Sequence, residues 1–366
     1  MSLRVLMSGG GTGGHIYPAL AIADALRAQR PEAEFLFVGA IGKMEMHRVP
    51  AAGYDIVGLP VSALHRKLDA RNLGFPFKLT ASLLKAWRTV GEFEPDVAVG
   101  TGGFASGPAL ASAAARGVPV FVQEQNAYPG ATNRLLGRVA TQVFTAYTAA
   151  HAYFASAKTC RTGNPLRSTL SRAALVPAAE ALSAFGLDPA KPTVLSFGGS
   201  LGSLAINRAH AELHDFYAAN PQLQLIWQTG EGYYERYRES PTAQLPNVHC
   251  TRYLDRMALA YSAASLVMCR AGALSIAELQ LLGKPAVLVP SPNVAGDHQT
   301  ANARAVAEGG GAVVVTDREL VPRLPVLLPE LLTDPARLGR LATSIGAQAM
   351  PGAAETIATH ILRHVS

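Results

Sequence analysis

The chain has 366 residues, of which 49% are apolar and 16% charged, enough material for the cores of two ordinary domains. Its net charge of +6 is modest and its basic residues are dispersed, so the sequence argues against a nucleic-acid partner. Three widely separated cysteines suit a reducing compartment better than a disulfide or zinc site, and no apolar stretch reaches the roughly 18–20 residues of a membrane-spanning helix.

Short apolar runs alternate with helical patterns through the first half of the chain. Strands are predicted over residues 3–8, 35–39, 96–100, 118–123 and 142–145, with helices over 18–28, 78–90, 106–116 and 132–139. This alternation indicates a parallel sheet covered by helices on both faces.

The pattern restarts in the second half. Strands are predicted over residues 191–197, 223–228, 266–269, 286–290 and 312–315, and a glycine loop and a helix follow the first of them. Two doubly wound, Rossmann-like domains, 1–162 and 163–345, explain this better than one extended sheet, and a ligand crevice is expected between them. The remaining segment, 346–366, carries a helix at 353–365 that we expect to pack back on the first domain.

The first glycine loop, residues 9–15, reads Gly-Gly-Gly-Thr-Gly-Gly-His. Gly9, Gly11 and Gly14 match the dinucleotide fingerprint G-x-G-x-x-G, but the second strand ends in Gly39 and Ala40 where that fingerprint needs an acid. NAD and FAD are therefore disfavoured. A strand-to-helix loop with free backbone N–H groups still suits an anion, and more glycine is present than a tight turn requires.

Further glycine loops, at residues 101–108 and 198–202, also follow predicted strands and lie where open α/β sheets bind ligands. The segment 270–278 opens a helix after a strand, so its N–H groups suit a diphosphate, and Glu278 in the first turn could accept both hydroxyls of a ribose. The alternative for this segment is structural, because Ser275 and Glu278 also fit a capping box.

Together these motifs resemble glycosyltransferase family 28. The matching segments are residues 10–15, 102–108, 124–126, 163–167, 198–202, 270–278 and 297–303, in the order that the family has them. The resemblance implies a GT-B fold, with two Rossmann-like domains facing each other across a cleft. It also implies an inverting transfer, without metal or other cofactor, of N-acetylglucosamine from UDP-GlcNAc to the C4 hydroxyl of the muramyl pentapeptide on undecaprenyl diphosphate (lipid I). The product, lipid II, serves peptidoglycan synthesis and hence cell shape and division.

The resemblance also implies that the first domain takes the acceptor and meets the membrane, while the second binds UDP-GlcNAc. The substrate-binding residues that it implies are Thr12, Gly13, Gly14, Phe104, Asn126, Arg167, Ser200, Leu254, Ala273, Leu274, Ser275, Ile276, Ala277, Glu278 and Gln299. Phe104 stands where some members have tyrosine, so no hydroxyl is needed there. Leu201 replaces a commoner glutamine, which weakens any claim for a side-chain contact at that position.

Two residues are candidates for the general base of this reaction. His15 comes first, since imidazole suits proton transfer at neutral pH, and Glu124 is its rival or a group that orients the acceptor. A histidine that opens a helix can also be purely structural. No D-x-D motif occurs, so helix N-termini and Arg167 are expected to stabilise the departing UDP.

Residues 75–88 interleave phenylalanine, leucine and tryptophan with Lys78, Lys85 and Arg88, shortly after Arg66 and two further cations, Lys67 and Arg71. This suits peripheral binding to an anionic membrane surface, which for a lipid-linked acceptor is the cytoplasmic face of the bacterial inner membrane. An ordinary amphipathic helix with a solvated basic face is the alternative. Two rival functions remain, a GT-B transferase with another lipid or small-molecule acceptor and a non-catalytic nucleotide-sugar-binding subunit.

Overall fold

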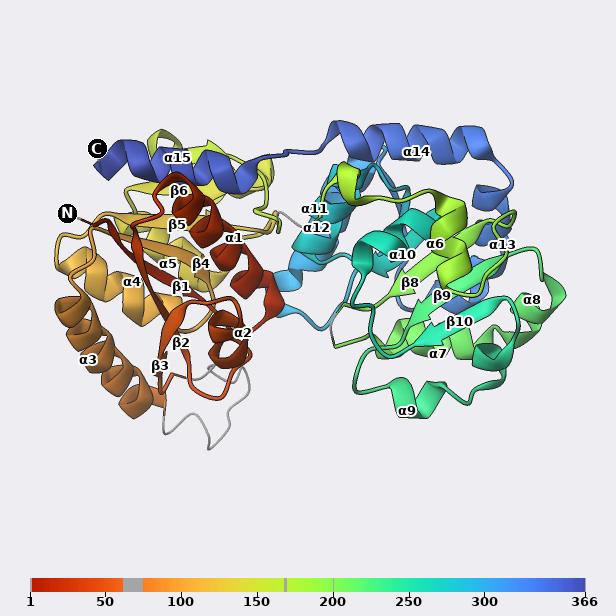
Figure 1. The fold of residues 1–366 in the computed structure, drawn as a ribbon, viewed down its shortest axis with the longest axis horizontal. Helices are drawn as coiled ribbons and strands as arrows, with labels where there is room; N and C mark the ends of the chain where they lie inside the picture. Colours follow the sequence, from red (N-terminus) through yellow and green to blue (C-terminus); the bar gives the residue numbers. More distant parts are fainter. Residues whose placement is uncertain (1, 62–74, 168–169, 200, 366) are drawn as a thin grey trace. The chain divides into compact units, whose positions relative to one another are not determined.

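The computed structural model describes residues 2–61, 75–167, 170–199 and 201–365 (Figure 1). The chain forms two compact units, of which unit 1 comprises Met1–Arg167 with Met350–Ser366 and unit 2 comprises Ser168–Ala349. The Arg66, Lys67 and Arg71 cluster and Ser200 fall outside the described residues.

Unit 1 is built on a parallel sheet with strand order β3-β2-β1-β4-β5-β6-β7. Its strands are β1 (Arg4–Gly9), β2 (Glu34–Ala40), β3 (Asp55–Leu59), β4 (Val97–Gly102), β5 (Val120–Glu124), β6 (Gln142–Thr145) and β7 (Thr159–Arg161). The apolar side chains of β1, β4 and β5 are buried on both faces, which is why these strands read as continuous apolar runs.

Helices cover both faces of this sheet (Figure 1). The apolar side of α1 (Gly13–Gln29) shares one buried cluster with that of α15 (Ala353–Val365). On the opposite face, α3 (Phe75–Phe93), α4 (Ser106–Ala115) and α5 (Ala131–Val139) share another, while the short α2 (Glu45–Ala51) lies between β2 and β3 in the chain. The last helix in the sequence therefore completes the core of the first unit.

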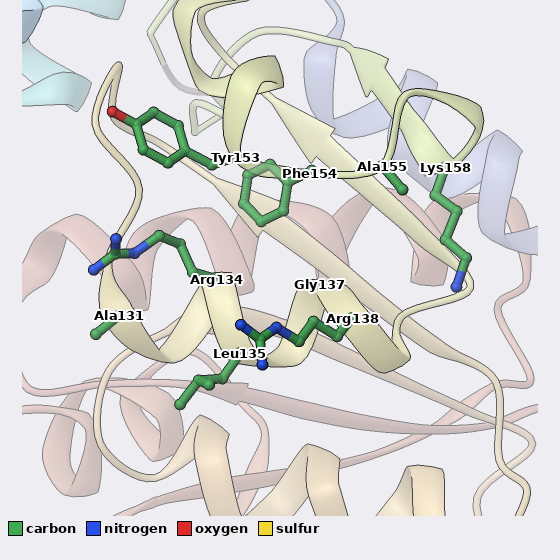
Figure 2. A pocket seen from close by; sticks show the side chains of 9 residues that line it. All are labelled: Ala131, Arg134, Leu135, Gly137, Arg138, Tyr153, Phe154, Ala155 and Lys158. Carbon is green, nitrogen blue, oxygen red and sulfur yellow. The ribbon is translucent and has the colours of Figure 1, made fainter.

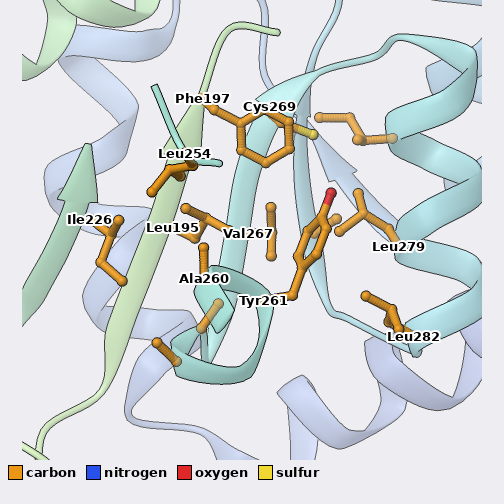
Figure 3. Packing of buried hydrophobic residues seen from close by; sticks show 14 of the residues in the cluster. Leu195, Phe197, Ile226, Leu254, Ala260, Tyr261, Val267, Cys269, Leu279 and Leu282 are labelled. Carbon is orange, nitrogen blue, oxygen red and sulfur yellow. The ribbon is translucent and has the colours of Figure 1, made fainter. Parts of the chain in front are cut away.

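Unit 2 repeats the architecture with strand order β10-β9-β8-β11-β12-β13. Its strands are β8 (Thr193–Phe197), β9 (Gln224–Gln228), β10 (Val248–Thr251), β11 (Leu266–Arg270), β12 (Ala286–Val289) and β13 (Ala312–Val314). Its helices are α6 (Ala178–Ala184), α7 (Leu204–Glu212), α8 (His214–Ala219), α9 (Tyr234–Tyr237), α10 (Met257–Ala263), α11 (Ala273–Leu282), α12 (His298–Glu308), α13 (Leu320–Leu332) and α14 (Pro335–Ala347). Figure 3 shows the cluster that α10 and α11 bury against β8 and β11.

The predicted class of two doubly wound parallel-sheet units is confirmed. The pattern misses the edge strands β3, β7 and β10, which are short or carry few apolar residues and so give little periodic signal. It also starts α1 too late. The helix begins at Gly13 and contains Pro18, so His15 is the third residue of the helix.

Candidate functional site

The first glycine loop rests on a buried carboxylate. Glu45, at the start of α2, accepts hydrogen bonds from the backbone N–H of Gly11 at 2.9 Å and from that of Ala40 at 3.0 Å. A β-carbon on Gly10 would collide with the Glu45 carboxylate, so a larger residue does not fit there. Nothing in the sequence indicates this support, because Glu45 lies 34 residues along the chain from Gly11.

The second glycine loop packs directly against the first. The N–H of Gly10 donates to the carbonyl of Gly102 at 3.2 Å, and a β-carbon on Gly103 would overlap the carbonyl of Gly10. Gly102 and Gly103 have φ of 102° and 93°, a region that favours glycine. The two motifs thus form one surface at the carboxyl ends of β1 and β4.

His15 lies at this junction. Its Nδ1 is 2.9 Å from the carbonyl oxygen of Thr101 and 3.0 Å from Oε1 of Gln125. Thr101 also donates its hydroxyl to the backbone carbonyl of His15 at 2.7 Å. Because a carbonyl oxygen can only accept, Nδ1 carries the proton in the neutral ring, and the lone pair is on Nε2.

Glu124, at the end of β5, is buried and fully engaged. Its Oε1 accepts from the backbone and side-chain amides of Asn126 at 2.9 and 3.1 Å. Its Oε2 accepts from the N–H of Gly130 at 3.1 Å and from the side chain of Asn133 at 2.9 Å. The carboxylate therefore fixes the turn between β5 and α5, and with it the position of Asn126.

The remaining unit 1 candidates lie around the start of α1. Thr12 is the N-cap residue, but its side chain makes no capping bond, and no acidic residue occupies the first turn. Thr12 and Gly14 are exposed, as is Phe104, whose ring lies 3.9 Å from the position of a β-carbon on Gly11. The guanidinium of Arg167 sits 3.6 Å from the ring centre of Tyr17 in α1. Together they leave an exposed, electropositive helix N-terminus.

In unit 2, the glycine loop after β8 forms an internal hydrogen bond and packs against the loop that contains Thr229. Gly199 and Gly202 have φ of 85° and 78°, and the N–H of Gly202 donates to the carbonyl of Gly199 at 3.0 Å. A β-carbon on Gly202 would collide with the carbonyl of Thr229. Leu201 is 74% exposed, so its side chain has no structural role that would exclude glutamine.

The segment around α11 corrects two expectations. The helix begins at Ala273 with Gly272 as its N-cap and no side-chain cap, so the capping box of Ser275 and Glu278 is wrong. Glu278 is the sixth helical residue, beyond the first turn where the sequence placed it. Its Oε2 accepts the hydroxyl of buried Tyr261 at 2.7 Å. Gly272, as the N-cap residue, has no side chain that could cap α11.

The loop before α11 is anchored by Arg270, whose two terminal nitrogens both bond the carboxylate of Asp317. In α12, Oε1 of Gln299 accepts the backbone N–H of Ser291 at 2.8 Å, and Asn302 donates to the carbonyl of Ala271 at 3.3 Å. These contacts connect the loops after β11, β12 and β13. Neither Asp317 nor Asn302 is among the predicted site residues. Nothing in the local sequence marks Asp317, whereas Asn302 lies in the segment 297–303 that resembles the family.

Several residues that the sequence predicts to bind substrate in unit 2 have buried side chains, so they can contact a ligand only through their backbone atoms. The side chains of Leu254 and Ile276 are in the buried cluster, and Figure 3 shows Leu254 beside Phe197. Ala273 and Ala277 are also buried, whereas Leu274 and Ser275 are half-buried.

The outer surface of α3 is apolar and basic. Phe77, Leu84 and Trp87 are 79%, 67% and 45% exposed, and Lys78 and Lys85 are exposed beside them. No helix in the described ranges is long and apolar enough to span a membrane.

A basic pocket of about 440 Å³ lies between α5 and the segment that follows β6 (Figure 2). Its charged lining residues, Arg134, Arg138 and Lys158, are all cations. Among the described residues neither arginine forms an ion pair, and Lys158 donates to the carbonyl of Ala140 at 2.9 Å. Exposed Leu135 also lines the pocket, so it presents positive charge next to an apolar side chain.

Comparison with known proteins places both units in one family. The family model for the glycosyltransferase family 28 N-terminal domain matches residues 5–145, and the model for the C-terminal domain of the same family matches residues 193–357. These two matches cover the sheet of unit 2 and, but for Arg4, strands β1 to β6 of unit 1, while β7 lies outside both.

The chain is also similar to curated proteins over its whole length. It is 47% identical to a Parabacteroides distasonis protein named UDP-N-acetylglucosamine--N-acetylmuramyl-(pentapeptide) pyrophosphoryl-undecaprenol N-acetylglucosamine transferase, over 98% of both chains. A Bacteroides fragilis protein of the same name is 44% identical, over 99% of this chain and 96% of its own.

Solved structures agree with the fold. The crystal structure of Acinetobacter baumannii MurG is 29% identical, with a TM-score of 0.75 over 99% of both chains. The glycosyltransferase of kitacinnamycin has a TM-score of 0.73 at 19% identity, over 100% of both chains, which is a likeness of fold alone.

Proposed function

The chain belongs to glycosyltransferase family 28, and from this membership we propose that it transfers N-acetylglucosamine from UDP-GlcNAc to the C4 hydroxyl of the muramyl sugar of lipid I. The enzyme is an N-acetylglucosamine transferase, and lipid II is its product for peptidoglycan synthesis. The observation that carries this is the end-to-end match to curated proteins of that name. This match does not favour the two alternatives, a transferase with another acceptor and a non-catalytic subunit that only binds a nucleotide sugar.

The base in this proposal is Nε2 of His15. As the acceptor hydroxyl attacks the anomeric carbon, its proton passes to Nε2, and UDP leaves with the electron pair of the bond that breaks. The Nδ1 contacts with Thr101 and Gln125 support this role, because they leave the lone pair on Nε2. Glu124 is disfavoured as the base, since each of its oxygens already accepts two hydrogen bonds. It instead positions Asn126.

Two helix N-termini and one cation stabilise the negative charge of the diphosphate groups on the two substrates. The N-terminus of α11 binds the diphosphate of UDP, and Glu278 accepts from the ribose. The uncapped N-terminus of α1, with Thr12, Gly13 and Gly14, faces the acceptor diphosphate. Arg167 adds positive charge beside α1 and can pair with a phosphate oxygen.

The acceptor is anchored in lipid, so the enzyme works as a peripheral protein at the cytoplasmic face of the bacterial inner membrane. The exposed apolar and basic face of α3 supports contact with anionic lipid, and the basic pocket beside α5 adds charge on the same side of the unit 1 sheet. Through lipid II the enzyme serves cell shape and cell division.

The test is UDP release by the purified chain, with UDP-GlcNAc and lipid I compared against other lipid acceptors. His15→Ala should fold normally and lower kcat by about 10²–10⁴-fold, the usual contribution of a general base. His47→Ala is the matched control, because His47 is exposed on α2 and should leave kcat unchanged. Turnover with an unrelated acceptor but not with lipid I would refute the proposed acceptor, and near wild-type kcat in His15→Ala would remove His15 from the base role.

A further inference from the structure

Gln125 is a buried amide that connects the end of β5 to the ring of His15. Its Nε2, which carries two N–H donors, lies 2.7 Å from the carbonyl oxygen of Thr101, 3.1 Å from that of Gln123 and 2.5 Å from Oε1 of Gln123. All three neighbours of this nitrogen accept hydrogen bonds, so the orientation of the amide is determined. Its Oε1 must then face Nδ1 of His15, at 3.0 Å.

This orientation has a consequence for the imidazole. Nδ1 lies between two oxygens that can only accept, Oε1 of Gln125 and the carbonyl of Thr101. The tautomer with the proton on Nδ1 shares one donor between these two acceptors, whereas the tautomer with the proton on Nε2 would set the Nδ1 lone pair against two other lone pairs.

We propose that Gln125 is a positioning residue, which holds His15 in the Nδ1–H tautomer with the Nε2 lone pair directed at the acceptor hydroxyl. The inference rests on the proposed role of His15 as the base. Gln125 itself does not touch the reacting atoms. Its role is to keep the neutral His15 ring in the tautomer whose Nε2 can accept a proton.

The surroundings hold both partners of this contact in place. The side chain of Asn164 donates to the backbone carbonyl of Gln125 at 3.1 Å, and Gln123 donates to Oδ1 of Asn164 at 3.2 Å. A β-carbon on Gly102 would lie 3.0 Å from the His15 ring, so backbone closes off one side of the imidazole. A ring held this closely has little room to turn away from Gln125.

Charged groups near the site are bound to partners of their own. Glu124 accepts four hydrogen bonds, Glu45 accepts two from backbone amides, and Arg167 lies over the ring of Tyr17. The two contacts of Nδ1 are both to neutral groups. The tautomer is therefore set by two neutral acceptors. The Thr101 acceptor is a backbone carbonyl, so only the side-chain oxygen of Gln125 can be removed by a substitution.

The experiment compares Gln125→Met with Gln123→Met in the full chain. Methionine keeps the length and flexibility of glutamine without its hydrogen bonds. Each variant removes one buried amide from the same network, but Gln123 does not contact His15, which makes it the matched control. The readouts are kcat, KM for UDP-GlcNAc, and the ¹⁵N shifts of the His15 ring, which report which nitrogen carries the proton.

We expect an Nδ1–H signal for His15 in the wild-type protein and in Gln123→Met. In Gln125→Met we expect a mixture with the Nε2–H form, and a kcat lowered by about tenfold at unchanged KM, because the Thr101 carbonyl still accepts. A wild-type Nε2–H signal overturns the inference, whether or not the variants fold. Equal losses of kcat in the two variants with unchanged ring shifts also overturn it, since they make Gln125 a structural brace.

The base role of His15 and the positioning role of Gln125 can be refuted separately. If His15→Ala keeps its turnover, His15 is not the base, and the role of Gln125 falls with it. If His15→Ala is inactive while Gln125→Met keeps wild-type kcat, only the positioning role is refuted.

Discussion

At the scale of single residues, His210 shows how burial makes a side chain sensitive to pH. Its Nδ1 is 2.8 Å from the hydroxyl of Tyr217 and its Nε2 is 2.7 Å from that of Ser196, all within the unit 2 core. Burial lowers the pKa of His210 from its ordinary value near 6.5 to about 3. Between these values the unfolded chain binds a proton that the native chain does not, so stability must fall as the pH falls through this window.

We predict that this residue alone lowers the free energy of unfolding by about 2 kcal/mol between pH 7 and pH 5. Urea unfolding followed by the fluorescence of Trp227, whose ring centre is 5.3 Å from that of His210, measures it. In His210→Gln, a neutral side chain that can still form hydrogen bonds, most of this pH dependence should disappear. An unchanged pH slope in the variant would contradict the assignment.

Sequence reasoning predicted the kinds of residue at the candidate site but not their partners. His15 and Glu124 stand in motifs that could be found by eye. Glu45, which supports the first glycine loop, and Tyr261, which bonds Glu278, come from other elements and have no local signature. Only the fold brings such pairs together, so the sequence could not show that Glu124 is fully engaged or which nitrogen of His15 is protonated.

At the scale of elements, the tightest constraint is the contact between the first two glycine loops. Gly103 has φ of 93° and touches the carbonyl of Gly10, while Gly117, at the end of α4, has φ of 78° and open space around it. An alanine at either position pays for the left-handed backbone, about 1 kcal/mol or somewhat more. At position 103, but not at 117, the methyl group of alanine would also collide with the first glycine loop and displace it.

We therefore predict that Gly103→Ala loses more stability than Gly117→Ala and also lowers kcat at least about tenfold, as expected when a catalytic group is displaced. Gly117→Ala should keep wild-type kcat at a slightly reduced Tm. Thermal unfolding and UDP release on the same preparations measure both effects. Equal kcat in the two variants would mean that the contact of the two loops does not position His15.

The elements that the sequence predicted best are those with long apolar runs. Central strands such as β1 and β4 are buried on both faces and each contains three consecutive apolar residues, so they are visible in the sequence. The edge strand β10 has one buried residue among its four, which leaves little pattern to read. The sequence predicts a start of α1 at Pro18, but the helix begins at Gly13 and accommodates this proline further along.

At the scale of the whole molecule, two copies of one architecture carry different surfaces. Unit 1 presents an exposed apolar and basic face on α3, with the basic pocket beside α5 on the same side of its sheet. In unit 2, the exposed large apolar side chains of Val326, on α13, and Leu201, in the glycine loop, lie on separate elements. The asymmetry supports membrane contact through unit 1 alone, a role that the sequence could suggest only for residues 75–88.

We predict that the chain floats with vesicles that contain anionic phospholipid and that raising the ionic strength releases it, because exposed cations supply part of the attraction. Phe77→Ser combined with Leu84→Ser should weaken the partition into such vesicles on the order of tenfold, since each leucine-sized side chain that enters the interface contributes apolar burial. Both side chains are exposed, so the fold should not change.

Val326→Ser is the matched control, because Val326 is 59% exposed on the other unit and should leave the partition unaltered. Arg138→Ala separates the contribution of the basic pocket and should weaken binding at low salt more than at high salt. Wild-type protein that stays with neutral and anionic vesicles alike would argue for apolar contact without charge. Wild-type protein that binds neither would leave α3 an ordinary amphipathic helix, and the enzyme would then have to reach its lipid-linked acceptor through another surface.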